Sequence, residues 1–130
     1  MVYYMPMLQN YYIGQYREDG LHGHNNGWIV GTFLADQPRK NEDVEIKYWE
    51  YAAGESVKSY KKVSAIIECT FILKGSTRCL IGDDEVILRT GDYIVIHPGT
   101  SNNTVAEILE DVVGLTIKAP SDPTAKKILS

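Results

Sequence analysis

The three histidines are the residues of this chain best suited to metal chemistry. His22 and His24 are separated by one residue, so on a strand their imidazoles would share a face and could hold a metal ion. They lie just before the turn-forming letters NNG at 25–27, which favour an exposed loop instead. No histidine follows until His97, so any histidine-based metal site depends on the first two.

The two cysteines favour neither a zinc site nor a disulfide. Cys69 and Cys79 stand almost symmetrically about Lys74 and Gly75, which predict a hairpin turn with the two thiols facing each other across its strands. No second Cys or His pair lies at ligand spacing, which argues against zinc. Because the sequence shows no secretory signal, we expect both thiols to be free.

Length and charge restrict the class of function. The chain has 130 residues, 44% hydrophobic and 23% charged, which is the composition of one globular domain. Its 13 Lys and Arg against 17 Asp and Glu are scattered without a basic stripe, so nucleic acid is not an expected partner. The apolar start lacks the charged flank of a signal peptide, and no apolar run approaches the ~20 residues of a membrane-spanning helix. We expect a soluble, cytoplasmic protein with no membrane partner.

The elements that must position these residues are predicted to be strands. Turn residues recur roughly every eight to twelve residues, with β-rich runs between them and no sustained helical period, which is typical of an antiparallel sandwich or barrel. One run, DVEIKYWEYA at 43–52, alternates clearly. Its apolar face carries Val44, Ile46 and Tyr48, and its mixed face carries Glu45, Lys47, Trp49 and Tyr51. The mixed face would contact either solvent or a polar barrel interior.

The stretch from 68 to 102 resembles the cupin superfamily. The first motif of that family ends in Glu, six residues and Gly, and Glu68 and Gly75 stand at this separation in ECTFILKG. The second motif opens with Gly, five residues, a Pro position, one residue and Gly, which here are Gly91, DYIVI, His97, Pro98 and Gly99. The resemblance implies an all-β double-stranded β-helix, or jelly-roll barrel. The glycines suit backbone with positive φ.

The metal ligands usual in that family are missing. Cupin enzymes commonly bind a transition metal through two histidines and a glutamate of the first motif and one histidine of the second. The first two positions fall on Lys62 and Ser64, or on Tyr60 and Lys62 if the preceding loop holds one extra residue. The last position falls on Asn102, so only Glu68 is retained. An ammonium and an amide beside one carboxylate suit a first-row metal poorly, and we predict no metal and no cofactor.

A polar pocket is still expected at the barrel mouth. The resemblance brings Tyr60, Lys62, Glu68 and Asn102 together there, and convergent polar groups in a barrel mouth form a default ligand site. Lys62 would either pair with Glu68 as a structural replacement for the metal or bind a carboxylate or phosphate of a ligand. Tyr60 could stack on a sugar ring.

Three functions are compatible with these residues, and whether the chain is an enzyme stays open. The first is a metal-free barrel that binds a small polar metabolite, a sugar or a carboxylate, without catalysis. The second is a metal-independent sugar epimerase or isomerase, with Glu68 or Tyr60 as general base. The third is a metal-dependent enzyme that uses His22, His24 and Glu68. His97 is expected at the barrel rim in a structural or interface role.

We expect a single cupin domain, with a barrel core over about residues 27–119, an N-terminal strand segment over 1–20 and a C-terminal tail over 120–130. Tyrosines are frequent in the N-terminal segment, and their amphipathic rings suit a protein interface. Small cupins are often dimers, so the resemblance implies a homodimer with this segment at or near the contact.

Overall fold

Two long antiparallel strands, β4 (Ile67–Ile81) and β7 (Asn102–Ala119), form the frame of the molecule in this computed structural model, which describes residues 10–23 and 25–129. One short π-helical turn, η1 (Glu18–His22), precedes the strands. The remaining strands are β1 (Trp28–Val30), β2 (Glu45–Tyr51), β3 (Lys62–Ser64), β5 (Asp84–Arg89), β6 (Tyr93–Ile96) and β8 (Lys126–Ile128). The all-β prediction is confirmed.

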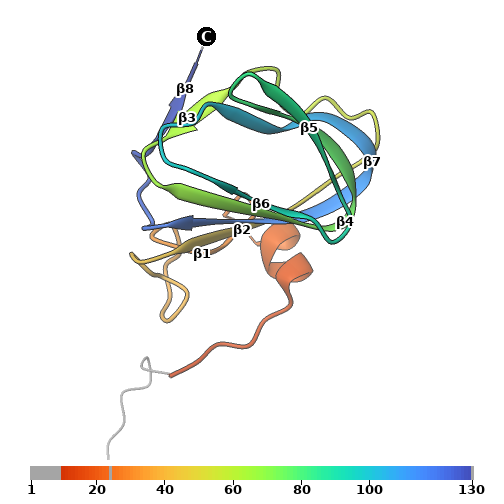
Figure 1. Ribbon diagram of the computed structural model, residues 1–130. Helices are drawn as coiled ribbons and strands as arrows, with labels where there is room; N and C mark the ends of the chain where they lie inside the picture. The colour runs from red at the N-terminus through yellow and green to blue at the C-terminus, as the bar shows by residue number, and fades with distance from the viewer. Residues whose placement is uncertain (1–9, 24, 130) are drawn as a thin grey trace, which may run out of the picture.

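The two long strands join the two walls of a barrel. They pair along almost their whole length, from Ile67 opposite Ala119 to Ile81 opposite Asn102. The first half of β4 also pairs with β6, and its second half pairs with β5. Along β7, one half pairs with β2 and the first residue pairs with β3. Figure 1 shows the result, with β1, β2 and β6 on one wall, β3, β5 and β8 on the other, and the long strands bending between them.

The bend in β4 depends on Gly75. Its φ is +90°, and the register between β4 and β7 shifts on both sides of it. A Cβ at this position would collide with the backbone carbonyl of Asp111 in β7, so only glycine fits. The predicted hairpin at Lys74 and Gly75 is therefore wrong, because the strand continues through a bulge. Cys69 and Cys79 lie on one strand, and both thiols are free, as predicted.

The two ends of the chain differ from the sequence prediction. Residues 10–15 form no strand, and η1 packs on the outer face of β2, where the rings of Tyr16 and Tyr48 stack with centroids 5.0 Å apart. Residues 1–9 lie outside the described residues. The predicted C-terminal tail is wrong in part, because residues 126–128 form β8 and pair with β3. Within the described part of the chain, no helix has the length and apolar character that a membrane crossing requires.

The barrel interior has an apolar part and a polar part. The apolar core contains Trp49, Ile72, Cys79, Leu88, Val105, Ile108 and Val112. The polar part contains buried charged side chains, among them Lys62, Glu68 and Lys118, at 7%, 2% and 8% exposure. Because charged side chains are almost never this buried unless paired, the polar part is where a function is expected.

Candidate functional site

Strand register brings the polar side chains together. Glu45 of β2 and Glu68 of β4 both stand opposite Lys118 of β7, so one carboxylate lies on each side of this lysine across three strands. Lys47 and Thr70 flank Thr116 in the same way, two residues along each strand. Residues directly opposite on neighbouring strands share a face of the sheet. These rows form one inner wall of the polar part of the barrel.

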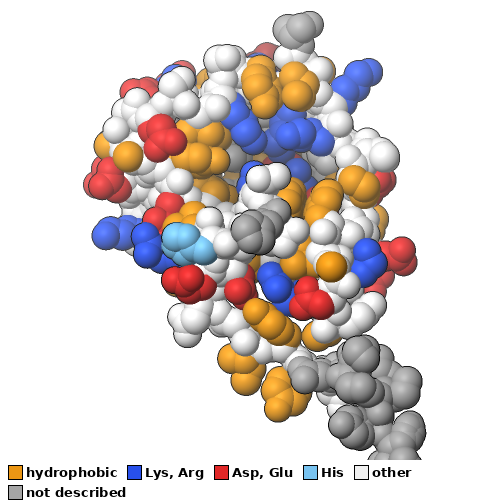
Figure 2. All heavy atoms as spheres, turned by 180° about the vertical axis from the view of Figure 1, so that it is seen from behind, with side chains coloured by type: hydrophobic (Ala, Val, Ile, Leu, Met, Phe, Trp, Pro, Cys, Tyr) orange, Lys and Arg blue, Asp and Glu red, His pale blue; other side chains and the backbone are white. Residues whose placement is uncertain are grey.

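A cavity of about 70 Å³ lies against this wall. Five lysines line it, together with one carboxylate, that of Glu68; the lysines are Lys47, Lys58, Lys62, Lys118 and Lys126. Both tryptophans of the chain, Trp28 and Trp49, line it as well. We call it the lysine cavity. Figure 2 shows Lys and Arg side chains gathered around a hollow on this face of the molecule. The mixed face predicted for β2 therefore contacts the barrel interior rather than solvent.

The strongest contact in the lysine cavity joins Lys62 and Glu68. The Lys62 Nζ donates to Oε1 of Glu68 at 2.6 Å and to Oε2 at 2.5 Å. The Lys118 Nζ lies 3.9 Å from Oε1 of the same carboxylate. Burial lowers the pKa of Lys62 to about 8, although the Glu68 carboxylate acts in the opposite direction. One carboxylate is thus shared by two buried ammonium groups.

Lys58 and Lys47 enter the cavity without such a partner. Neither takes part in an ion pair among the residues that the structure describes. Burial, reinforced by the charges of Lys47, Lys126 and Lys118, lowers the pKa of Lys58 to about 8. Burial also lowers the pKa of Lys47, whose Nζ lies 5.7 Å from the ring centroid of Trp28. The cavity therefore holds a surplus of positive charge.

A second cavity, of about 210 Å³, adjoins the first and shares Trp28, Lys118 and Lys126 with it. Its lining adds the carboxylates of Glu45 and Asp122. The Glu45 carboxylate accepts a hydrogen bond from the Ser121 hydroxyl at 3.0 Å, and burial raises its pKa. Two carboxylates of this region therefore lie beside the lysine cavity, while that of Glu68 lies inside it.

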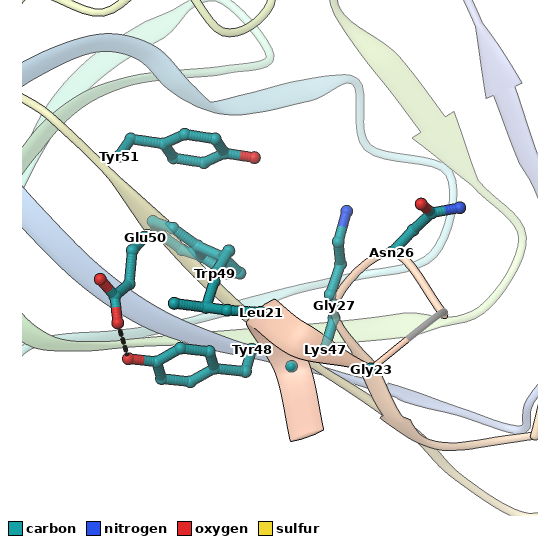
Figure 3. A pocket seen from close by; sticks show the side chains of 10 residues that line it. Leu21, Gly23, Asn26, Gly27, Lys47, Tyr48, Trp49, Glu50 and Tyr51 are labelled. Carbon is teal, nitrogen blue, oxygen red and sulfur yellow. Dashed lines mark hydrogen bonds between the residues drawn. The ribbon is translucent and has the colours of Figure 1, made fainter. Parts of the chain in front are cut away.

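A larger open groove, of about 490 Å³, runs along β2 near η1. It shares Lys47, Trp49 and Tyr51 with the lysine cavity, and Figure 3 shows these residues together with the hydrogen bond from Tyr48 to Glu50. The Glu50 carboxylate also accepts a bond from Arg17 Nε at 2.7 Å. The Glu50 carboxylate of this groove is therefore already bound by Arg17, just before η1, and by Tyr48 of β2, and these contacts join the start of η1 to the barrel.

The sequence-predicted pocket residues do not all meet. Lys62 and Glu68 line the lysine cavity, while Tyr60 is half-buried and lies outside its lining. Asn102 is fully buried and stands directly opposite Lys62 in the register of β3 and β7. Its Nδ2 donates to the Thr100 carbonyl at 3.1 Å, and its Oδ1 has no partner among the described atoms.

Neither of the two described histidines, His22 and His97, lines this cavity. His22 is exposed at the end of η1, and His24 lies outside the described residues. His97 is exposed after β6, with its Nδ1 3.1 Å from the Pro98 carbonyl. Residues 10–23 and 25–129 contain no group of three His, Cys, Asp or Glu side chains placed to hold a metal. The usual metal position does not fit a metal, because the Lys62 ammonium occupies the oxygens of Glu68.

Sequence reasoning missed four of the five lysines, namely Lys47, Lys58, Lys118 and Lys126. For Lys47 a signal was present, since it alternates with Trp49 and Tyr51 on the mixed face of β2. The others come from a loop, from β7 and from β8, and only strand register brings them together.

Three solved structures show the fold of this chain. No protein-family model matches the sequence, and no curated protein matches it. Oxalate decarboxylase from Bacillus subtilis superposes with a TM-score of 0.59 at 14% identity, over 68% of this chain and 24% of that one. The DMSP lyase from Ruegeria pomeroyi superposes with a TM-score of 0.58 at 20% identity, over 69% of this chain and 45% of that chain.

A cupin 2 conserved barrel domain protein from Rhodopseudomonas palustris gives a TM-score of 0.56 at 21% identity, over 74% of this chain and 61% of that chain. The alignment spans only about a quarter of the oxalate decarboxylase and less than two thirds of the other two chains. At these identities the likeness shows the fold alone.

Proposed function

We propose that this chain, which has the cupin fold, binds a small anionic metabolite, a carboxylate or a phosphate, in its lysine cavity and does so without a metal. The observation that carries the proposal is the excess of lysines over carboxylates in that cavity. Five lysines surround a single carboxylate, and that carboxylate is already bound by Lys62. Like charges held together away from water repel one another, and a bound anion would relieve this repulsion.

The size of the cavity supports a small ligand. At about 70 Å³ the lysine cavity has room for a few non-hydrogen atoms, and the adjoining cavity of about 210 Å³ extends it past Trp28. A sugar ring would have to displace the lysine side chains, and Tyr60, the residue expected to stack on it, is not in the lining. These features favour a small anion over a sugar.

The contacts of Glu68 favour binding over isomerisation. A general base needs a lone pair directed at the proton that it removes. Both oxygens of Glu68 accept hydrogen bonds from Lys62, so a substrate proton would have to compete with an ammonium group for the carboxylate. Among the described residues, the carboxylates of Glu45 and Asp122 line the adjoining cavity instead of the lysine cavity.

Calorimetric titration of the purified protein with phosphate, oxalate and malonate tests the proposal, with glucose as the uncharged control. Lys126 and Lys127 offer a matched pair, because both are exposed on β8 but only Lys126 lines the cavity. We expect Lys126→Ala to weaken binding of the preferred anion roughly tenfold, about 1.4 kcal/mol. Lys127→Ala should leave it within about twofold.

Two results would overturn the proposal. One is the failure of every anion to bind at millimolar concentration, and the other is an equal loss of affinity in the two variants. Elemental analysis by mass spectrometry tests the metal-free part separately. A near-stoichiometric transition metal in untagged, chelator-free protein would contradict it.

The homodimer stays a prediction. The aromatic side chains expected at its contact are exposed in the single chain, with Tyr11 at 69% and Tyr16 at 53%. Light scattering coupled to size exclusion, on the full chain and on a Tyr11→Ser, Tyr16→Ser variant, would test both the dimer and the place of its contact.

A further inference from the structure

We propose that the amine of Lys58 forms a reversible imine with a small 2-oxo carboxylate bound in the lysine cavity. This inference rests on the proposed function, because the carboxylate of the ligand must first be held by the other lysines. The imine would add a covalent step to a site that otherwise holds its ligand by charge alone.

The position of Lys58 is fixed by the fold. It belongs to the loop between β2 and β3, and its backbone carbonyl accepts a hydrogen bond from Asn103 Nδ2 at 3.1 Å. Asn103 is buried at 4% exposure in β7, so it anchors the loop to the barrel frame. The side chain of Lys58, which is half-buried, lines the lysine cavity.

The surroundings of Lys58 favour its neutral form. Burial is the main cause, and the ammonium groups of Lys47, Lys126 and Lys118 add to it, so that the pKa of Lys58 falls to about 8. Glu68 acts in the opposite direction, but its carboxylate is bound by Lys62. Near neutral pH the neutral fraction of such an amine exceeds that of an ordinary lysine on the order of a hundredfold. A neutral amine is the nucleophile that carbonyl chemistry requires.

The lysines differ in a way that defines the class of ligand. Lys126 is exposed at the cavity mouth, and Lys118 lies 3.9 Å from the Glu68 carboxylate, so both are suited to hold a carboxylate as ammonium groups. Lys58 has no ion-pair partner among the described residues and can present its nitrogen to a neighbouring carbonyl carbon. A ligand that satisfies both kinds of group carries a carboxylate next to a ketone or an aldehyde. The cavity volume restricts it to a short carbon chain.

The step needs no oxidant, reductant or metal. The Lys58 nitrogen attacks the carbonyl carbon, and a carbinolamine forms when the nitrogen transfers a proton to the oxygen. The hydroxyl then leaves with the second proton of the nitrogen as water, and a carbon–nitrogen double bond forms. Hydrolysis reverses the same step. Neighbouring ammonium groups, of which Lys62 is one, can supply and recover the proton.

Reductive trapping tests the inference. The protein is incubated with pyruvate and sodium cyanoborohydride, and intact mass spectrometry with peptide mapping locates the reduced adduct. Lys58→Arg keeps a positive charge but cannot form an imine. Lys61→Arg is the matched control, because Lys61 lies in the same loop and its Nζ donates to the Gly82 carbonyl outside the cavity. Thermal melting of each variant confirms folding, and calorimetry with lactate, which replaces the ketone by a hydroxyl, measures anion binding in the unaltered protein.

The expected result is one adduct per chain on residue 58, formed at least about tenfold faster than on any other lysine. It should be lost in Lys58→Arg and retained in Lys61→Arg. If lactate binds but pyruvate is trapped nowhere, or equally on many lysines, the imine is wrong and the proposed function stands. If neither lactate nor pyruvate binds, the imine is overturned, and the proposed function falls with it only if phosphate, oxalate and malonate fail to bind as well.

Discussion

Lys62 and Glu68 form a buried ion pair six residues apart in the chain, on two strands that are not paired with each other. The Nζ lies 2.6 and 2.5 Å from the two carboxylate oxygens, and the two side chains are 9% and 3% exposed. The pair joins two positions, Lys62 and Glu68, at which the resemblance to the cupin motifs would place metal ligands. The Lys62 ammonium group donates to both oxygens and so supplies the positive charge that a buried carboxylate needs. A bound metal cation would be another source of that charge.

Removal of one partner of this pair should cost more than removal of both. Lys62→Met leaves the Glu68 carboxylate buried with Lys118, at 3.9 Å, as its remaining ion-pair partner among the described residues, and we expect a loss of about 3 kcal/mol in the free energy of unfolding. Lys62→Met combined with Glu68→Leu should recover most of that loss. Urea unfolding of the two single variants and the double variant measures the coupling. Additive losses would show that the pair does not act as a unit.

Substitution of Gly75 and of Gly91 would measure two effects of an added side chain separately, namely backbone strain at positive φ and collision of the Cβ with a neighbouring strand. Both have φ of +90°, but only at Gly75 would a Cβ collide with backbone, while nothing lies within 4 Å of one at Gly91. We expect Gly91→Ala to cost about 1 kcal/mol through backbone strain alone. Gly75→Ala should cost about 3 kcal/mol or more, because the bulge in β4 must also move away from β7. Equal losses in chemical denaturation would contradict this account of the bulge.

Stability should rise with pH through the titration of Lys58. Its pKa is about 8 in the folded chain against an ordinary 10.5, so between these values the unfolded chain binds a proton that the folded chain lacks. The cost of burying the charged Lys58 amine in the folded chain is fully present below pH 8, and it decreases as the pH rises above this value. Lys58→Met removes this contribution, so the stability of the variant relative to the unaltered protein should fall between pH 7.5 and 9.5. We expect a fall of about 1 kcal/mol, below the ~2 kcal/mol that the shift alone implies, because the side chain is only half-buried.

Urea unfolding of both proteins at the two pH values measures the difference. The comparison cancels groups that act in the opposite direction, since burial raises the pKa of Cys79 and that of Tyr51. An unchanged difference between the two pH values would mean that Lys58 keeps its proton in the folded state.

Anion affinity should fall as the pH rises above about 8. The proposed ligand binds ammonium groups, and Lys58 and Lys62 both have a pKa of about 8 in the free protein. Calorimetry with phosphate or oxalate from pH 7 to 9.5 should therefore show a rising dissociation constant. Lys58→Arg stays charged over this range and should flatten the profile. The same profile in both proteins would exclude Lys58 from the binding equilibrium.

The fold was predictable because it depends on local signals. Glu68 with Gly75, and Gly91 with Pro98 and Gly99, keep their spacing along the chain, and Gly75, Gly91 and Gly99 adopt the positive φ that glycine allows. The glycine signal led to a wrong prediction of a hairpin turn at Lys74 and Gly75, because a glycine with positive φ occurs in a β-bulge as well as in a reverse turn. The choice depends on the pairing of β4 with β7, which is a tertiary property.

The site was less predictable because its charges are far apart in sequence. Lys47 and Lys118 are brought together by the register of β2 and β7, and Lys126 by a strand that was expected to be a tail. Tyr60 was expected in the pocket, but the loop places Lys58 there instead. A bulge shifts strand register by one residue, so positions beyond it cannot be assigned to a face from alternation alone.

The placement of Trp28 and Trp49 provides an optical probe of the proposed site. The chain has no other tryptophan, and both indoles line the lysine cavity, with the Nζ atoms of Lys47 and Lys118 5.7 and 5.9 Å from the ring centroid of Trp28. Entry of an anion would move these charges relative to the rings and change the local field at the indoles. The tryptophan emission of the unlabelled protein therefore reports on the lysine cavity and on the adjoining cavity and groove that share its indoles, so a library of metabolites can be screened without a tag, a dye or an assumed reaction.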